Sequence, residues 1–489
     1  MKPGYIASPE RLATVRKQRT VAMLMRQIER GDWKRFLIQC QKAAHRYPSI
    51  KQHSGEIAPL LVKVNVVRSA IRLHVQTLAG KPVTISTPEG FDQQRVAVEL
   101  IRQQSHFDAL LMQAVRTANI DGWSTLRVDM RPGVGLVVCC DDNAMILPVG
   151  PDGADMQPSV FERRWFIKRS DPIQGKKTYL RVERHWAPDG QGRVDQEVYQ
   201  VKNEDAFVDL NSDGVTRVDL AKVFPENTPA ELTLTGVPYP LITRLVNEYF
   251  DGRPEMLMSE HDFDLLDMSA AAISRLDRTM EQHGNPKVRI PENLINNQTG
   301  KAEIGEAIVD ADKLFEYIDQ KVNFDAMFTA MNKTLQLLCT QLQASPALLG
   351  FKLDGGAMPD TFDKLRLEAT QTLARAETSA KYMGPALGRV FTTASMLDTQ
   401  LPMRGYPVAP VSVVMHPGLP KDQLTIAREM RELRGTGEHD AMVDLQTVIE
   451  AVHGEAAAPQ ILERLKAERD ETTRRNQQEI YGAFNGGAA

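Results

Sequence analysis

The fold of this chain is decided by residues 255–284, which read EMLMSEHDFDLLDMSAAAISRLDRTMEQHG. Apolar residues recur there at spacings of three and four, which predicts one amphipathic helix. The side expected to pack consists of Leu265, Met268, Ala272 and Leu276. Gly284-Asn285-Pro286 ends the helix, because proline disfavours helical geometry in the residue before it.

The same stretch is strongly acidic. Its net charge is −5, whereas the whole chain of 489 residues has a net charge of −4. Against Arg275 and Arg278 stand seven carboxylates: Glu255, Glu260, Asp262, Asp264, Asp267, Asp277 and Glu281. The side away from the packed one therefore presents carboxylates, either as an ordinary solvated face or as a surface that repels polyanions.

The order of elements after this helix is distinctive. A compact segment, 285–319, contains expected strands at Val288–Ile290 and Ala302–Ile308. A second helix follows, and a loop with Gly355-Gly356 leads to a long helix from about Asp360. The second helix has one apolar stripe: Phe324, Met327, Phe328, Met331, Leu335, Leu338 and Leu342. Two long helices that bracket a small knob predict an elongated hairpin.

Before residue 255 the pattern is mixed. The first 60 residues read as helical, and residues 1–50 hold eleven Lys and Arg against three acids. This excess either meets an anionic surface or is balanced by acids elsewhere in the chain. A helix is expected from about Leu60 to Ala79, and short strands separated by turns form a β-rich module over about 123–239. The overall expectation is an α+β chain that is mainly helical.

Composition and motifs argue against several classes. Hydrophobic residues at 42% and charged residues at 25% are ordinary globular values, and four cysteines cannot make a disulfide framework. No apolar run approaches a membrane span and no signal peptide is visible, so a soluble intracellular protein is expected. A phosphate-binding loop and the common hydrolase and metalloprotease motifs are absent from the sequence. An enzyme is therefore not predicted, and no cofactor is expected.

One weak metal motif occurs at Asp209–Gly214, which matches the first half of a calcium loop. Its twelfth position is Leu220 instead of the glutamate that a calcium loop needs. A hairpin turn accounts for the segment better, because Asn and Asp bond their own backbone there. No metal site is predicted.

Several segments together resemble the portal proteins of tailed bacteriophages, of the long-tailed type. Val64-Asn65-Val66-Val67 through Gly80-Lys81-Pro82-Val83 looks like that family's early helix and turn. Val237-Pro238-Tyr239-Pro240 through Asp267 is similar to its approach into the first stem helix. Ser345 to Gly350, Asp354-Gly355-Gly356 and the helix from Phe362 resemble its tunnel loop and wing helix, and Ile461–Glu468 resembles its charged C-terminal helix. Met358-Pro359-Asp360-Thr361 replaces the Ser-Gly pair of many relatives, so the tunnel-loop conformation stays open.

The resemblance implies a domain plan. Residues 1–253 and 360–425 would form the wing, 254–284 and 320–345 the two stem helices, and 285–319 the clip. Residues 346–359 would be a tunnel loop, and 426–489 a helical crown. Copies would assemble into a ring, typically a dodecamer, at one capsid vertex of the virion, after synthesis in the host cytoplasm. Expected partners are double-stranded DNA in the channel, the terminase large subunit, the major capsid protein and scaffold, and a head–tail adaptor. No membrane partner is expected.

The resemblance also implies roles for particular residues. Glu260, Asp264, Asp267, Asp277 and Glu281 would line the DNA channel, and an acidic lining keeps DNA from adhering. The tunnel loop would present Lys352, Asp354, Gly355 and Gly356, with Lys352 either touching phosphate or only solubilising the loop tip. The clip would dock terminase and the adaptor through Lys287, Arg289, Lys301 and Glu303. The alternatives are a helical capsid-associated adaptor or scaffold without a channel and, less favoured, a DNA-acting ATPase or nuclease.

Overall fold

A computed structural model divides the chain into two compact units, Met1–Gly418 and Leu419–Ala489. The structure describes residues 9–32, 34–36, 38, 65–149, 158–171, 175–226, 228–250, 253–258, 262–284, 288–289, 316–317, 324–351, 367–401, 404–419 and 463. The fold below is that of the first unit. The crown expected over 426–489 lies outside the described residues, except for position 463.

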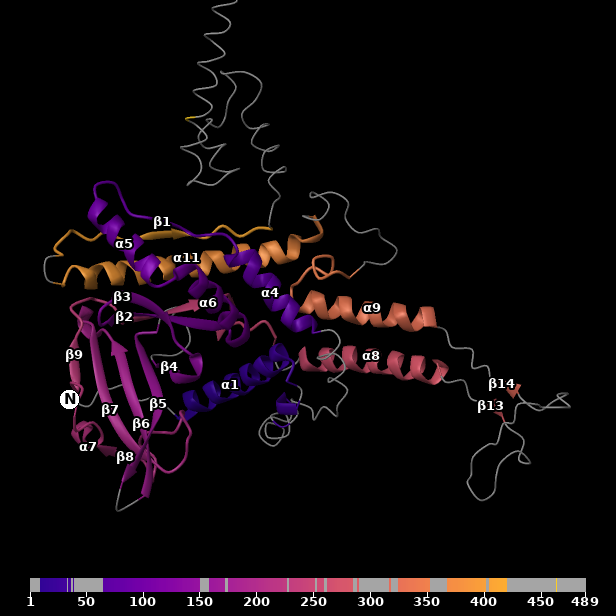
Figure 1. The fold of residues 1–489 in the computed structure, drawn as a ribbon, viewed down its shortest axis with the longest axis horizontal. Helices are drawn as coiled ribbons and strands as arrows, with labels where there is room; N and C mark the ends of the chain where they lie inside the picture. Colours follow the sequence, from indigo (N-terminus) through magenta and orange to yellow (C-terminus); the bar gives the residue numbers. More distant parts are fainter. Residues whose placement is uncertain are drawn as a thin grey trace, which may run out of the picture. The chain divides into compact units, whose positions relative to one another are not determined.

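Four helices share one hydrophobic core: α1 (Pro9–Arg30), α4 (Val66–Ala79), α8 (Asp262–Gly284) and α9 (Phe324–Gln341). Each contributes a stripe of apolar side chains, such as Met25 on α1 and Ile71 on α4, both fully buried. Phe36 follows α1 and packs against Phe263 of α8 with ring centroids 6.3 Å apart. Figure 1 shows α8 and α9 side by side, beyond the ends of α1 and α4. This core holds only one end of the α8–α9 pair.

A second core lies around the long helix α11 (Thr370–Asp398). Helices α5 (Asp92–Gln104) and α6 (Phe107–Asp121) pack on it, and the rings of Phe107 and Phe391 meet at 4.8 Å. The same core takes the three-stranded antiparallel sheet of β10 (Ile242–Val246), β2 (Trp123–Arg131) and β3 (Gly135–Cys140). Almost every side of the C-terminal half of α11 is therefore buried.

A two-stranded sheet of β1 (Thr84–Ser86) and β15 (Ser412–Val414) lies along α11 (Figure 1). Gly388 of α11 allows this approach, because a Cβ there would lie only 2.5 Å from the carbonyl oxygen of Val411.

A six-stranded antiparallel sheet forms the rest of the described fold. Its order is β4 (Ile146–Val149), β5 (Val160–Asp171), β6 (Gly175–Trp186), β7 (Arg193–Val201) and β8 (Thr216–Val218), and β9 (Leu232–Leu234) also pairs with β7. Short helical turns η1 (Asn143–Met145), η2 (Pro188–Gly190) and α7 (Leu220–Val223) connect the strands. Strands β11 (Tyr249–Phe250) and β12 (Arg253–Pro254) pair just before α8.

One side of this sheet buries charge. Glu162 on β5 is fully buried and accepts hydrogen bonds from Arg164 Nε at 2.8 Å and from Arg184 Nε at 2.7 Å. Arg164 also donates to the carbonyl oxygens of Ala206 and Val208, so it ties the segment after β7 to the sheet. Buried charges persist only when they are paired and hydrogen-bonded, and this cluster meets that condition.

The expectation of a mainly helical chain is wrong. Helix makes up about 48% of the structure and strand about 23%, with several antiparallel sheets, which is a mixed α+β fold. The predicted strands within 123–239 are confirmed in position, but they are not one module of short strands. Strands β2 and β3 belong to the helical core around α11, whereas β5 and β6 are twelve-residue strands of the other sheet. Charged residues interrupt the apolar pattern of β5 and β6, so the sequence pattern predicted strands shorter than the observed ones.

The basic N-terminal helix is balanced inside the chain. Arg26 of α1 lies 2.7 Å from Asp121, and Arg16 lies 2.7 Å from Asp205. Arg19 donates to the carbonyl oxygen of Ile146 and lies 3.7 Å from Asp121. Burial lowers the pKa of Arg19 to about 10, which still leaves it cationic near neutral pH. Of the two interpretations of the basic segment, these three arginines fit the second, because contacts elsewhere in the chain hold them.

The segment Asp209–Gly214 folds as a turn. Asp209 accepts hydrogen bonds from the backbone of Asn211 and of Ser212, and Gly214 has a φ of +92°. Among the described residues, no group of three His, Cys, Asp or Glu side chains is placed to hold a metal ion. Within the same residues, no helix combines the length and apolarity that crossing a membrane requires.

The Glu162 cluster yields a stability prediction. Replacing Glu162 by Gln leaves Arg164 and Arg184 without their shared buried carboxylate, so the free energy of unfolding should fall by about 3–5 kcal/mol. Urea denaturation followed by circular dichroism measures this change. Lys168→Gln, an exposed position on the same strand, is the matched control and should change stability by less than about 1 kcal/mol. Equal effects of the two variants would contradict the role given to Glu162.

Candidate functional site

The candidate site is the α8–α9 pair with the strands at its far end. The first stem helix was expected over 254–284, but α8 begins at Asp262, because residues 253–254 form β12. The second was expected over 320–345, and α9 covers Phe324–Gln341. Between the helices, β13 (Val288–Arg289) pairs antiparallel with β14 (Glu316–Tyr317). In Figure 1 these short strands lie beyond the ends of both helices that are away from the core.

The root of the pair is buried. Leu335 and Leu338 of α9 and Leu342, which follows it, enter the core, which confirms the C-terminal half of the predicted apolar stripe. The prediction for the packed side of α8 holds in part: Leu276 is buried and Leu265 is half-buried against the core, but Met268 is exposed. The main buried set is instead Phe263, Leu266, Ala270 and Ile273, and Phe263 contacts Phe36.

The acidic residues of α8 do not form a single row. Asp264 is exposed and Asp267 is half-buried, one turn apart on the side away from the core. Arg275 and Arg278 continue that same side of the helix. Asp277 is also exposed, but thirteen residues at about 100° each place it about 140° around the helix axis from Asp264. Asp267 lies between the other two, about 60° from Asp264 and about 80° from Asp277, so the three aspartates spread over one arc of about 140°.

The other residues predicted for the channel and the clip are described in part or not at all. Glu281 belongs to α8 and follows Asp277 by one turn, while Glu260 lies outside the described residues. Arg289 belongs to β13, and Lys287, Lys301 and Glu303 lie outside. The strand predicted at Val288–Ile290 is confirmed at Val288–Arg289. The strand predicted at Ala302–Ile308 lies outside the described residues, and the sequence pattern did not indicate β14, which pairs with β13.

The connection from α9 to α11 is anchored by polar contacts that the sequence pattern did not reveal. Ser345 N donates to Thr372 Oγ1 at 2.8 Å, and Arg375 donates to Gln343 Oε1 at 2.6 Å. His74 of α4 donates from Nε2 to the carbonyl oxygen of Leu342 at 2.9 Å. Residues 346–351 then form turns, and Lys352, Asp354, Gly355 and Gly356 lie outside the described residues. The start of the expected tunnel loop is thus fixed to both α4 and α11.

The environment of His74 suppresses its charge. Burial, and next the positive charge of Arg375, lower the pKa of His74 to about 3, although its hydrogen bond to Leu342 opposes the shift. Burial also lowers the pKa of Arg375, which Glu255 and Glu248 partly offset. No sequence signal marked His74, because it sits within the apolar stripe of α4 and its partners are distant in the chain.

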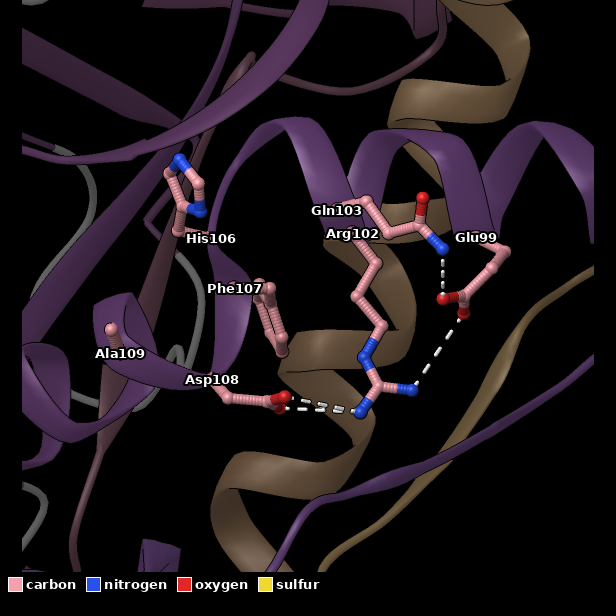
Figure 2. Close-up of a pocket in the computed structure, with 7 residues that line it drawn as sticks. All are labelled: Glu99, Arg102, Gln103, His106, Phe107, Asp108 and Ala109. Atoms are coloured by element: carbon pink, nitrogen blue, oxygen red, sulfur yellow. Dashed lines mark hydrogen bonds and ion pairs between the residues drawn. The ribbon is translucent and has the colours of Figure 1, made fainter. Parts of the chain in front are cut away.

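A separate surface hollow lies where α5 meets α6, lined by Glu99, Arg102, Gln103, His106, Phe107, Asp108 and Ala109. Figure 2 shows Arg102 directed toward both Glu99 and Asp108. Gln103 donates to Glu99 at 3.0 Å. These charges satisfy one another, so the hollow offers no convergent group for a ligand.

His74 gives a testable pH dependence. Because its folded pKa of about 3 is below the unfolded value near 6.5, the stabilisation is complete above pH 6.5 and is lost as pH falls toward 3. In that window the wild type should lose up to about 1.4 kcal/mol per pH unit more than His74→Leu. Urea denaturation at pH 7, 5.5 and 4 measures the difference. Parallel pH dependences of the two proteins would contradict the buried neutral state.

Comparison with known proteins adds no relative: no protein-family model matches the chain, and no curated protein matches its sequence.

Proposed function

We propose that this protein is a portal protein of a tailed bacteriophage. Copies of the chain form a ring at one vertex of the capsid, and double-stranded DNA passes through its centre during packaging and ejection. The ring docks the terminase large subunit during filling and neck or tail proteins afterwards. It contacts the major capsid protein and scaffold, assembles in the host cytoplasm and remains in the virion.

The observation that carries this proposal is the α8–α9 pair, which is buried at its root but keeps apolar side chains in water. Met268 and Met280 of α8 are 61% and 53% exposed, and Phe328 and Leu337 of α9 are 41% and 60% exposed. Exposed apolar groups on paired helices mark an interaction surface. Neighbouring copies arranged around an axis would cover both helices at once, and a ring is the closed form of such head-to-tail contacts.

The acidic side chains of α8 support a passive channel. DNA binds proteins chiefly by exchanging counterions for Lys and Arg, so a lining of carboxylates does not hold it. Asp264, Asp267 and Asp277 spread over an arc of about 140° around α8, and the part of this arc that faces the channel would form its wall. In this proposal a separate terminase hydrolyses ATP, and the portal acts as conduit and docking face.

The assembly is tested directly by electron microscopy and mass photometry of the purified protein. A closed ring with a central hole, and a mass near twelve times the 54.6 kDa of one chain, are expected. Leu337→Glu and Met268→Glu place charges on the surface that neighbouring copies would cover, and they should shift the mass toward single chains.

The control for assembly is Leu234→Glu on β9, where an equally exposed apolar residue lies outside α8 and α9. This variant should assemble like the wild type. Discrete monomers or small oligomers of the wild type would instead favour the helical adaptor or scaffold without a channel.

The channel lining is tested by charge reversal. The double variant Asp264→Lys/Asp267→Lys and the single variant Asp277→Lys reverse charges at different positions around α8, and each variant whose residues face the channel should shorten the packaged genome. Packaged genome length is measured by gel electrophoresis of DNA from particles. Asp213→Lys, in the exposed turn after β7, is the control. Full-length genomes from all variants would refute the acidic lining.

A further inference from the structure

One side of the six-stranded sheet carries a continuous row of arginine and aromatic side chains. The row defined here as the Arg–Trp row consists of Arg163, Trp165 and Arg169 on β5, Arg181 on β6, and Phe224 after α7. The register places Trp165 directly opposite Arg181, and alternation along β5 puts Arg163, Trp165 and Arg169 on one side of the sheet. Glu162 and Arg164 point to the opposite side, where the buried cluster lies.

Ring contacts link the row from end to end. The Arg163 and Arg181 guanidiniums lie 4.7 and 5.0 Å from the ring centre of Trp165. Arg181 lies 4.9 Å and Arg169 5.8 Å from the ring centre of Phe224. Such contacts hold each guanidinium over an aromatic face without neutralising its charge.

The acceptors within the chain do not match these donors. Arg181 donates to the neutral side chain of Gln196, and its Nε and that of Arg163 have no hydrogen-bond partner within the described structure. Arg163 is 3.7 Å from Asp141 and 3.9 Å from Glu183, beyond hydrogen-bond distance. Both carboxylates have closer partners, since Arg127 lies 2.8 Å from Asp141 and His185 lies 2.6 Å from Glu183.

The charge of the row is only partly compensated, because Arg163 lies within ion-pair distance of Asp141 and Glu183 whereas the other two arginines form no ion pair in the described structure. Burial, and the nearby Arg163, lower the pKa of Arg181, although Glu183 partly opposes this shift. Neither Arg169 nor Arg181 has a carboxylate within ion-pair distance in the part of the chain that the structure describes. Placing like charges side by side costs free energy unless an anion joins them. The two buried Nε atoms are out of reach of an external ligand, but the charges of the exposed Arg169 and the half-buried Arg181 favour anionic oxygens from outside the chain.

The length of the row selects a linear polyanion over a small ion. Arg163 and Arg169 are six residues apart on one extended strand, which spans about 20 Å at roughly 3.3 Å per residue. One strand of a nucleic acid presents about six phosphates over that distance. Guanidinium groups match phosphate oxygens in bidentate geometry, and the half-buried rings of Trp165 and Phe224 offer apolar contact to sugars or bases. An acidic polypeptide would use only the charges.

We propose that the Arg–Trp row of the six-stranded sheet binds the phosphodiester backbone of a nucleic acid, at a site separate from the α8–α9 pair. This binding does not depend on assembly into a ring or on the portal function.

The strand itself supplies a matched pair of variants. Arg169 and Lys168 are adjacent, both exposed and both cationic, but they lie on opposite sides of the sheet, and Lys168 is 2.6 Å from Glu204. Fluorescence anisotropy with a labelled 30-base-pair DNA, titrated at several salt concentrations, measures both affinity and its salt slope. Arg169→Gln should lower the slope by about 1 and weaken binding several-fold, and Arg169→Gln/Arg181→Gln should lower it by about 2. Lys168→Gln should leave both unchanged.

Two further measurements locate and identify the ligand. Trp165→Phe keeps an aromatic ring in the row but removes one indole, so the change in tryptophan fluorescence on adding DNA should largely disappear. Single-stranded DNA and polyglutamate serve as competitors and distinguish a single strand or an acidic polypeptide from the duplex. Absence of salt-dependent binding by the wild type, equal effects of Arg169→Gln and Lys168→Gln, a persisting fluorescence change, or competition by polyglutamate equal to that by DNA would each overturn the proposal.

Discussion

The described structure depends on one buried contact, the apolar root that α8 and α9 share with α1 and α4. Phe263 and Leu266 of α8 and Leu338 of α9 have almost no exposed surface there. The other sides of the same two helices expose apolar side chains, both at this root (Met268 and Leu337) and further along (Met280 and Phe328). Because the α8–α9 pair is held at one end, packing at this root sets the direction of both helices. The polar joint of His74, Ser345 and Thr372 fixes the outgoing chain at the same place, so root and joint act as one anchor.

Charged side chains are arranged in different ways in different parts of this protein. Arginines of the basic first helix find their carboxylates at Asp121 and Asp205, and the buried Glu162 is shared by two arginines of its own sheet. On the opposite side of that sheet the balance is partial: Arg163 and Arg181 lie over the ring of Trp165, and of these two only Arg163 has carboxylates within ion-pair distance. The acids of α8 form a third pattern, spread over an arc of one helix. A single net charge near zero conceals all three arrangements.

Local periodicity predicted the helices well where one stripe stood alone. On α9 and just after it, Leu335, Leu338 and Leu342 admit only one packed side, and the structure buries it. On α8 the predicted side is only partly buried, and the main buried set includes Phe263, which contacts Phe36 more than 200 residues away in the chain. Strands β5 and β6 were underestimated because Glu162, Arg164 and Arg184 are charged yet buried, and burial of paired charge leaves no periodic signal. His74 and the Arg–Trp row were missed for a different reason: their partners come from separate elements, which no local sequence pattern reveals.

The placement of α1 has a consequence for how the chain acquires its structure. Arg16 pairs with a residue 189 positions later, and Arg26 with one 95 positions later, so α1 reaches these partners only when much later parts of the chain are in place. Contacts of such sequence separation slow folding, because the intervening chain must be ordered before they form. The buried apolar side of α1, with Leu24, Met25 and Ile28, is exposed in any state in which α1 has not yet docked. A chaperone that covers this apolar side would therefore protect the folding chain from aggregation.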